Sequence, residues 1–149
     1  MNTPSVATSV SASVSGSIRA AMLTPDPSAK VMATRDVFRR WRRGKLDFTF
    51  ECRMPDVPAR PDAPALLPPG AMPKRGSGGS ERKRIALIHA LAHIEFVAID
   101  LALDAAGRFG AAMGPQFVDD WLSVAADEAM HFALLARRLR TLGSFYGAM

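Results

Sequence analysis

Residues 117–142 read FVDDWLSVAADEAMHFALLARRLRTL, and apolar residues recur through them at the helical spacings of three and four. On one face of that helix, Glu128 and His131 interrupt an otherwise apolar series. The whole series is Phe117, Trp121, Val124, Glu128, His131, Leu135, Leu139 and Leu142. An ionised carboxylate in a buried apolar stripe is costly unless another group pairs with it. The stretch therefore predicts a long helix with a functional pair at its centre.

The stretch before it has the same character. Ser80 is a suitable cap for a helix over about 81–109, and Gly114-Pro115 marks the turn that follows it. Glu95 is the one charge in a stripe of that helix made of Ile88, Leu91, Ala92, Glu95, Ala98, Ile99 and Ala102. Two long helices with so short a link form an antiparallel hairpin, in which the midpoints meet. Glu95 is therefore expected to face Glu128 and His131.

Two carboxylates and an imidazole that converge in an apolar interior leave two interpretations, which are neutralisation by protonation and a bound divalent metal ion. Glu128 and His131 are three residues apart and can reach one ion together. Their oxygen and imidazole donors suit iron or manganese. His93 and Asp127 project from other sides of their helices, so we expect them to support the ligands rather than bind the metal.

The rest of the chain predicts a single all-α domain with an extended segment. Residues 1–22 are expected to be a disordered tail, because they are rich in Ser, Ala and Thr without a clear helical period. A short basic helix is predicted over about 27–43, with Asp26 as its cap. The Pro-rich stretch that follows is expected to wrap a surface as an extended arm, so that 23–80 form helix and arm and 81–149 form the hairpin.

Composition limits the kinds of site and the cellular location expected for the chain. Cys52 is the only cysteine, which excludes an intramolecular disulfide and a zinc site built on cysteines. No secretory signal is recognisable, and no apolar run approaches the roughly 20 residues that span a bilayer. These observations predict a cytoplasmic protein without a membrane partner.

From Leu23 onward the chain resembles the domain-of-unknown-function 455 family, which is placed in the ferritin-like superfamily. The matching stretches are LTPDPSAKVMATR, WRRGKLDF, MPDVPARPDAP, HALAHIEFVAIDLALD and DDWLSVAADEAMHFALLARRL. The resemblance implies a ferritin-like bundle with Glu95, Glu128 and His131 as ligands of a di-metal site, and it assigns no reaction. Members look about twice as long, and their second half supplies another Glu and another Glu-x-x-His.

The resemblance thus implies a truncated protein that carries half of a di-iron or di-manganese site. The leading hypothesis is an oxidoreductase-type protein that a second copy completes, through the exposed apolar side of the hairpin. One alternative is an inactive fragment without a metal function.

Another alternative is a nucleic-acid-binding module. Its candidate residues are Arg39, Arg40, Trp41, Arg42 and Arg43, where positive charges surround an aromatic ring. Residues 30–84 hold 14 Lys or Arg against 6 Asp or Glu, whereas residues 85–142 hold 4 against 7. Pairing of these arginines with the acidic hairpin is therefore the favoured interpretation of this stretch.

Overall fold

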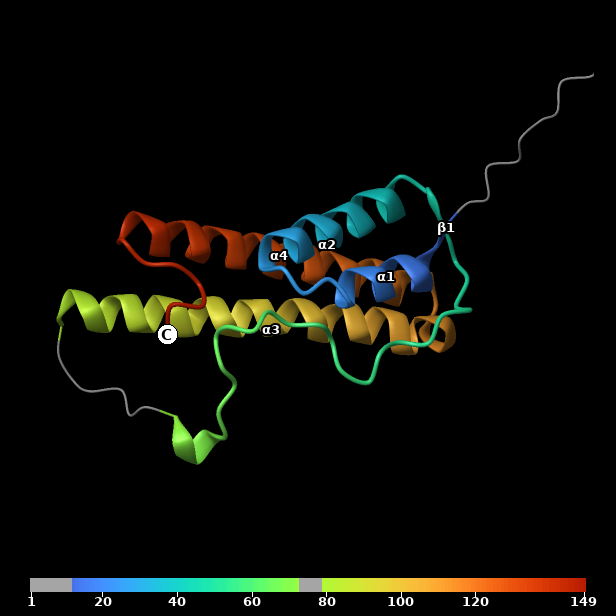
Figure 1. Cartoon of the computed structure of the whole chain (residues 1–149). Helices are drawn as coiled ribbons and strands as arrows, with labels where there is room; N and C mark the ends of the chain where they lie inside the picture. The colour runs from blue at the N-terminus through green and yellow to red at the C-terminus, as the bar shows by residue number, and fades with distance from the viewer. Residues whose placement is uncertain (1–11, 73–78) are drawn as a thin grey trace, which may run out of the picture.

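The computed structural model describes residues 12–72 and 79–149 and confirms an all-α fold (Figure 1). Its helices are α1 (Val14–Met22), α2 (Pro27–Arg42), α3 (Glu81–Met113) and α4 (Pro115–Thr141). Two two-residue strands, β1 (Ala12–Ser13) and β2 (Leu46–Asp47), pair in parallel, and a short 3₁₀ turn, η1, covers Pro69–Ala71.

The α3–α4 hairpin is the long axis of the molecule. Ser80 caps α3 by accepting a hydrogen bond from the amide of Lys83, as predicted. Gly114 ends α3 at a φ of 96°, which a side chain would disfavour, and Pro115 begins α4 directly after it. The sequence predicts the second helix over about 115–141, and these bounds are confirmed, whereas α3 continues four residues beyond the predicted end at 109.

Gly110 lies inside α3 rather than at its end. A methyl group on Gly110 would lie 2.6 Å from Cγ2 of Val118 and 2.9 Å from Cζ of Phe50. The glycine is therefore a site of close approach between α3, α4 and the segment after β2. Sequence alone could not separate this role from that of a helix terminator.

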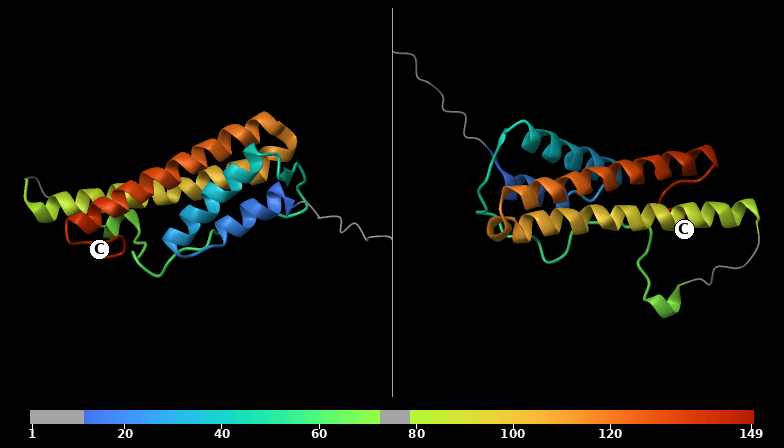
Figure 2. Two further views of the ribbon diagram at one scale, coloured as in Figure 1. Left: turned by 90° about the horizontal axis from the view of Figure 1, so that it is seen from above. Right: turned by 180° about the vertical axis from the view of Figure 1, so that it is seen from behind.

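Helices α1 and α2 lie together on one side of the hairpin, α1 against α3 and α2 against α4 (Figure 2). The prediction of a disordered tail is wrong for residues 12–22. Val14, Ile18 and Met22 recur every fourth residue, and each is at most 2% exposed. Their spacing is helical, but the many serines and alanines around them obscured it. Residues 1–11 of the predicted tail lie outside the described residues.

The arm after β2 is extended, as predicted, and it follows the hairpin to η1 (Figure 1). Its Met54 is 3% exposed and packs against Gly107 of α3. The amide of Ala59 donates to the carbonyl of Met22, which ties the arm to the end of α1. The glycines and serines of residues 76–80 predict a flexible joint, of which residues 76–78 lie outside the described residues.

A buried ion pair joins α2 to α3. Lys30 is 0% exposed, and its Nζ lies 2.6 Å from Oδ1 of Asp100. The same Nζ donates to the carbonyls of Met22 and Ala59 at 3.1 and 2.8 Å, so all of its donors have partners. Burial lowers the pKa of Lys30 and raises that of Asp100. Sequence reasoning did not find this pair, because neither residue belongs to a recognisable motif.

The buried face of α4 differs from the prediction by about one residue. It consists of Val118, Leu122, Ala125, Ala129, Phe132, Ala136 and Leu139. Of the predicted stripe, Leu139 is buried, whereas Trp121 and Val124 are 36% and 39% exposed. The predicted stripe therefore lies at the edge of a second, uncovered side of the hairpin. Helix α4 carries apolar residues on two adjacent faces, and periodicity alone cannot say which one the chain covers.

We call this second side the open face. Seen from behind, no described helix lies over α3 and α4 (Figure 2). Large apolar side chains, all at least 36% exposed, mark it along both helices: Leu87, Leu91, Ile94, Leu101, Phe109, Met113, Trp121, Val124 and Leu134.

Among the described residues, α3 is also the helix whose length and composition would suffice to cross a membrane. Of its most apolar 18 residues, 33% are buried. The expectation that no segment reaches this composition was therefore too strict. One such helix is weak support for a span, because helices in protein cores meet the same criterion.

Candidate metal centre

Glu95, Glu128 and His131 converge at the centre of the open face. Nδ1 of His131 lies 3.1 Å from Oε2 of Glu128 and 3.5 Å from Oε2 of Glu95. One donor atom from each residue lies within 4.8 Å of the other two. Donors that share one ion at about 2.1 Å lie about 3–4 Å apart, so small side-chain rotations suffice for common coordination. The predicted meeting of the three side chains is confirmed as geometry.

The cluster is less buried than predicted. The side chains of Glu95 and Glu128 are 25% and 23% exposed, and that of His131 is 54% exposed. They stand at the edge of the α3–α4 contact and not inside it. This follows from the one-residue shift of the buried face of α4.

The three groups alter one another's protonation. A hydrogen bond with Glu128 raises the pKa of Glu95, and burial and the charge of Glu128 add to that effect. The same hydrogen bond lowers the pKa of Glu128, with further help from His131. Hydrogen bonding to Glu128 raises the pKa of His131. In the absence of a metal ion, the cluster thus holds an ionised Glu128 between two groups that retain protons more readily than usual.

The two residues expected to support the ligands are placed differently. Nδ1 of His93 lies 2.8 Å from the hydroxyl of Tyr146, on another side of α3 from Glu95. Burial lowers the pKa of His93 and raises that of Tyr146 to about 12. Asp127 is exposed beside Glu128. The structure therefore gives His93 a different partner and leaves the expected role of Asp127 as a prediction.

Tyr146, like Lys30 and Asp100, was not found from the sequence. Its ring packs on Phe96 and Phe132, with centroids 5.5 and 5.0 Å away. Each of these residues follows a proposed ligand in the sequence, Glu95 and His131. The amide of Gly147 donates to Nε2 of His89 at 2.9 Å, which fixes the chain after Tyr146 against α3. Tyr146 thus closes the space between the two helices behind the cluster.

The basic stretch at the end of α2 is engaged within the molecule. Nη1 of Arg42 lies 3.0 Å from both carboxylate oxygens of Asp119 in α4, and Nε1 of Trp41 donates to the same carboxylate at 3.2 Å. Arg39 and Arg40 pair with Asp36 in their own helix. Arg43 is exposed. These contacts agree with pairing between this stretch and the acidic hairpin, the interpretation favoured from sequence.

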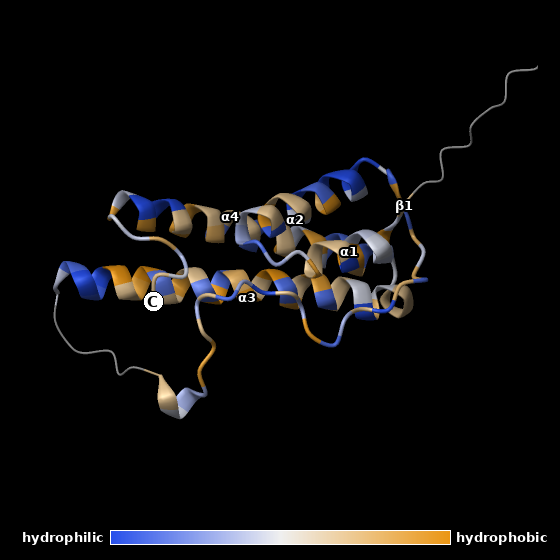
Figure 3. Ribbon diagram, viewed as in Figure 1, coloured by the Kyte–Doolittle hydropathy of each residue, from blue (hydrophilic) through white to orange (hydrophobic). Residues whose placement is uncertain are grey.

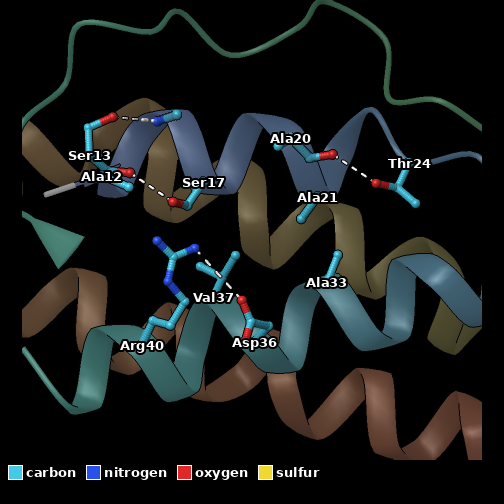
Figure 4. Close-up of a pocket in the computed structure, with 11 residues that line it drawn as sticks. Ala12, Ser13, Ser17, Ala20, Ala21, Thr24, Ala33, Asp36, Val37 and Arg40 are labelled. Carbon is cyan, nitrogen blue, oxygen red and sulfur yellow. Dashed lines mark hydrogen bonds and ion pairs between the residues drawn. The ribbon is translucent and has the colours of Figure 1, made fainter. Parts of the chain in front are cut away.

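A groove of about 410 Å³ separates α1 from α2 (Figure 4). Small side chains line most of it, and its polar groups bond one another, as Ser17 does to the carbonyl of Ser13 and Arg40 to Asp36. No charged group of the groove is both buried and without a partner among the described residues. The groove therefore contributes no candidate chemistry.

Comparisons with known proteins identify the family and leave the chemistry open. The family described as "Protein of unknown function (DUF455)" matches residues 23–149. The chain belongs to this family. An uncharacterised protein of Haemophilus influenzae (strain ATCC 51907 / DSM 11121 / KW20 / Rd) is 39% identical over 141 residues, which cover 87% of this chain and 49% of that relative. The chain thus spans about half the length of the curated relative it matches. No solved structure matches it.

Proposed function

We propose that Glu95, Glu128 and His131 bind iron or manganese as one half of a two-metal carboxylate site in a ferritin-like protein of oxidoreductase type. The observation that carries the proposal is the convergence of one imidazole and two carboxylates on a largely apolar face. Protein carboxylates rarely gather among leucines without a charged partner. A divalent ion supplies that partner and would compete with protons for Glu95 and His131.

The donor set fits the metal ion. Two oxygen donors and one imidazole nitrogen match the preferences of iron and manganese better than those of copper. Glu128 and His131 come from consecutive turns of one helix and Glu95 from its neighbour, so the backbone of the hairpin fixes the spacing of the donors. A bound ion of this kind supplies Lewis acidity and one-electron redox chemistry. The residues of the chain hold it, orient it and limit the water around it.

Metal binding is tested with Mn²⁺, followed by the loss of the free-ion signal in electron paramagnetic resonance, and with Fe²⁺ under anaerobic conditions. We expect roughly one ion per chain for half of a two-metal site. Glu128→Gln and His131→Gln each weaken binding by about 100-fold or more, since loss of a supporting group alone costs about 10–100-fold. Glu81→Gln, in the exposed first turn of α3, is the matched control and binds as the wild type does.

The same titration distinguishes the alternatives. Wild-type affinity in Glu128→Gln would contradict the proposed ligands and favour a chain without a metal function. Asp127→Asn tests the supporting role expected of Asp127, which predicts a loss of about 10-fold to 100-fold.

A further inference from the structure

The open face combines two features that a free surface seldom carries together. Its large side chains are strongly exposed, as Leu101 and Met113 are at 66% and 62%. Contiguous apolar surface of this kind marks an interaction site in soluble proteins. At its centre stand three proposed ligands, whereas an iron or manganese ion takes about six. Whatever covers the face is therefore expected to bring further donors to its centre.

We propose that the open face pairs with the same face of a second copy of this chain, about a two-fold axis that lies in the interface at the level of Glu128 and runs perpendicular to α4. The statement that the second copy contributes metal ligands rests on the proposed function. The statement that the two copies pair rests on the exposed apolar surface alone. In this arrangement α4 packs antiparallel on α4 of the second copy, and six ligands meet at the axis.

The position of the cluster along α4 favours this axis. Helix α4 runs from Pro115 to Thr141, so 13 residues precede Glu128 and 13 follow it. A perpendicular two-fold axis at Glu128 therefore overlaps the two copies of α4 over their whole length. An axis near either end of the helix would leave half of each apolar face uncovered.

Charge selects the direction of the axis. Arg82 and Arg84 lie in the first turn of α3, and α4 ends with Arg138 and Arg140, so both clusters occupy the same end of the hairpin. Figure 3 shows this end as hydrophilic on both helices, beyond the apolar middle of α3. A two-fold axis parallel to the helices would bring these ends together and oppose like charges. The perpendicular axis places each basic end over the opposite end of the other copy.

A specific pair follows from this geometry. Asp120 and Arg138 are 18 residues apart, which is five helical turns and about 27 Å, so they lie on the same side of α4. Asp120 precedes Glu128 by 8 residues and Arg138 follows it by 10. The perpendicular axis therefore brings Arg138 of one copy close to Asp120 of the other, at both rims of the interface.

The number of long helices also agrees with a common bundle architecture. Two hairpins placed face to face would form a bundle of four long helices, with α1 and α2 of each copy on the outside.

Sedimentation equilibrium of the full chain, with and without Mn²⁺, tests the pairing. We expect a dimer that Trp121→Glu weakens by roughly 100-fold, because the substitution buries a charge in the apolar part of the interface. Leu101→Glu is a second variant on the same face, and far-ultraviolet circular dichroism verifies that both are folded. The matched control is Met32→Glu, since Met32 is 73% exposed on α2, outside the open face. A monomer under all conditions, or a dimer that both open-face variants leave intact, would overturn the proposal.

A charge exchange tests the axis. Asp120→Arg and Arg138→Asp each oppose like charges at both rims, and we expect each to weaken the dimer by about 3-fold to 10-fold. The double variant restores the pair in reverse and returns dissociation to within about 2-fold of the wild type. Equal weakening in the double variant would overturn the perpendicular axis.

The results separate this inference from the proposed function. A monomer that binds Mn²⁺ through Glu128 refutes the pairing and leaves the ligands standing. A dimer that depends on Trp121 and binds no Mn²⁺ supports the pairing and refutes the metal site. A dimer whose Mn²⁺ ions show spin coupling supports both, because the two ions then lie side by side across the axis.

Discussion

The polar groups on the two sides of the α3–α4 hairpin differ in their burial and in their partners. On the side covered by α1 and α2, Lys30 and Asp100 are almost fully buried and satisfy one another within the chain. On the open face, Glu95, Glu128 and His131 stay partly exposed, and a metal ion could reach all three. The first group carries structural stability, and the second keeps its binding capacity available. Both lie near the middle of α3, five residues apart at Glu95 and Asp100.

The difference follows from desolvation. A buried ion pair is stable only when every donor has a partner, which Lys30 achieves through Asp100 and two backbone carbonyls. Oδ2 of Asp100 accepts no hydrogen bond among the described residues and has Arg60 at 3.6 Å as its counter-ion. Partly exposed carboxylates keep part of their hydration and can remain together without such a network.

The largest effect is expected on the covered side. Lys30→Met leaves the Asp100 carboxylate buried with Arg60 alone, and we expect a loss of about 3–5 kcal/mol in the free energy of unfolding. Urea denaturation followed by circular dichroism measures it. Glu128→Gln on the open face should change stability by less than about 1 kcal/mol. Equal losses in both variants would remove the distinction between the two sides.

Two further variants refine that result. Arg53→Ala removes an exposed ion pair with Asp56, both 83% exposed, and serves as the matched control with a loss below about 1 kcal/mol. Lys30→Met combined with Asp100→Leu replaces both charges by apolar groups and should recover much of the stability. Failure to recover would indicate that Lys30 acts through the backbone carbonyls more than through Asp100.

A smaller effect is expected where the arm and the two long helices come closest. Gly110→Ala would place a methyl group 2.6 Å from Val118, and we expect a loss of about 1–3 kcal/mol from overpacking. Gly79→Ala has nothing within 4 Å and is the control, with little change expected. An unaltered denaturation midpoint in Gly110→Ala would show that this contact relaxes freely.

Much of the architecture could be read from the sequence, and the failures have physical causes. The hairpin and its central cluster were predictable, because polar residues stood out against a helical period in both stretches. The side of burial was not predictable, since α3 and α4 carry apolar residues on two adjacent faces and the chain covers one of them. The pair Lys30 and Asp100 was equally hidden, because 69 residues separate its members and a single helical Lys is usually exposed.

Behind the cluster, Tyr146→Phe is expected to lower the free energy of unfolding by about 0.5–1.5 kcal/mol. Tyr146→Phe removes the hydrogen bond between its hydroxyl and Nδ1 of His93 and keeps the ring packed on Phe96 and Phe132. The loss of stability is measured by urea denaturation, and Phe145→Ala, at a side chain that is 60% exposed, is the control. Mn²⁺ affinity should be unaltered in Tyr146→Phe, which would show that the two sides act independently.

The finest test uses the three histidines of the chain, which report on the two sides separately. Burial lowers the pKa of His89 and His93, whereas Glu128 raises the pKa of His131. The stability contributed by His89 and His93 is therefore present above the ordinary pKa of histidine and is lost as pH falls through their lowered values. The contribution of His131 has the opposite sign, present below the ordinary pKa and lost as pH rises through its raised value. Two-dimensional NMR of the metal-free protein is recorded from pH 5 to pH 8. As pH rises, the rings of His89 and His93 should lose their protons first and the ring of His131 last. Glu128→Gln should return the pKa of His131 toward its ordinary value. It should leave the pKa values of His89 and His93 unchanged, because Glu128 lies on the open face. Three coincident titrations would mean that the two sides of the hairpin do not differ in electrostatics.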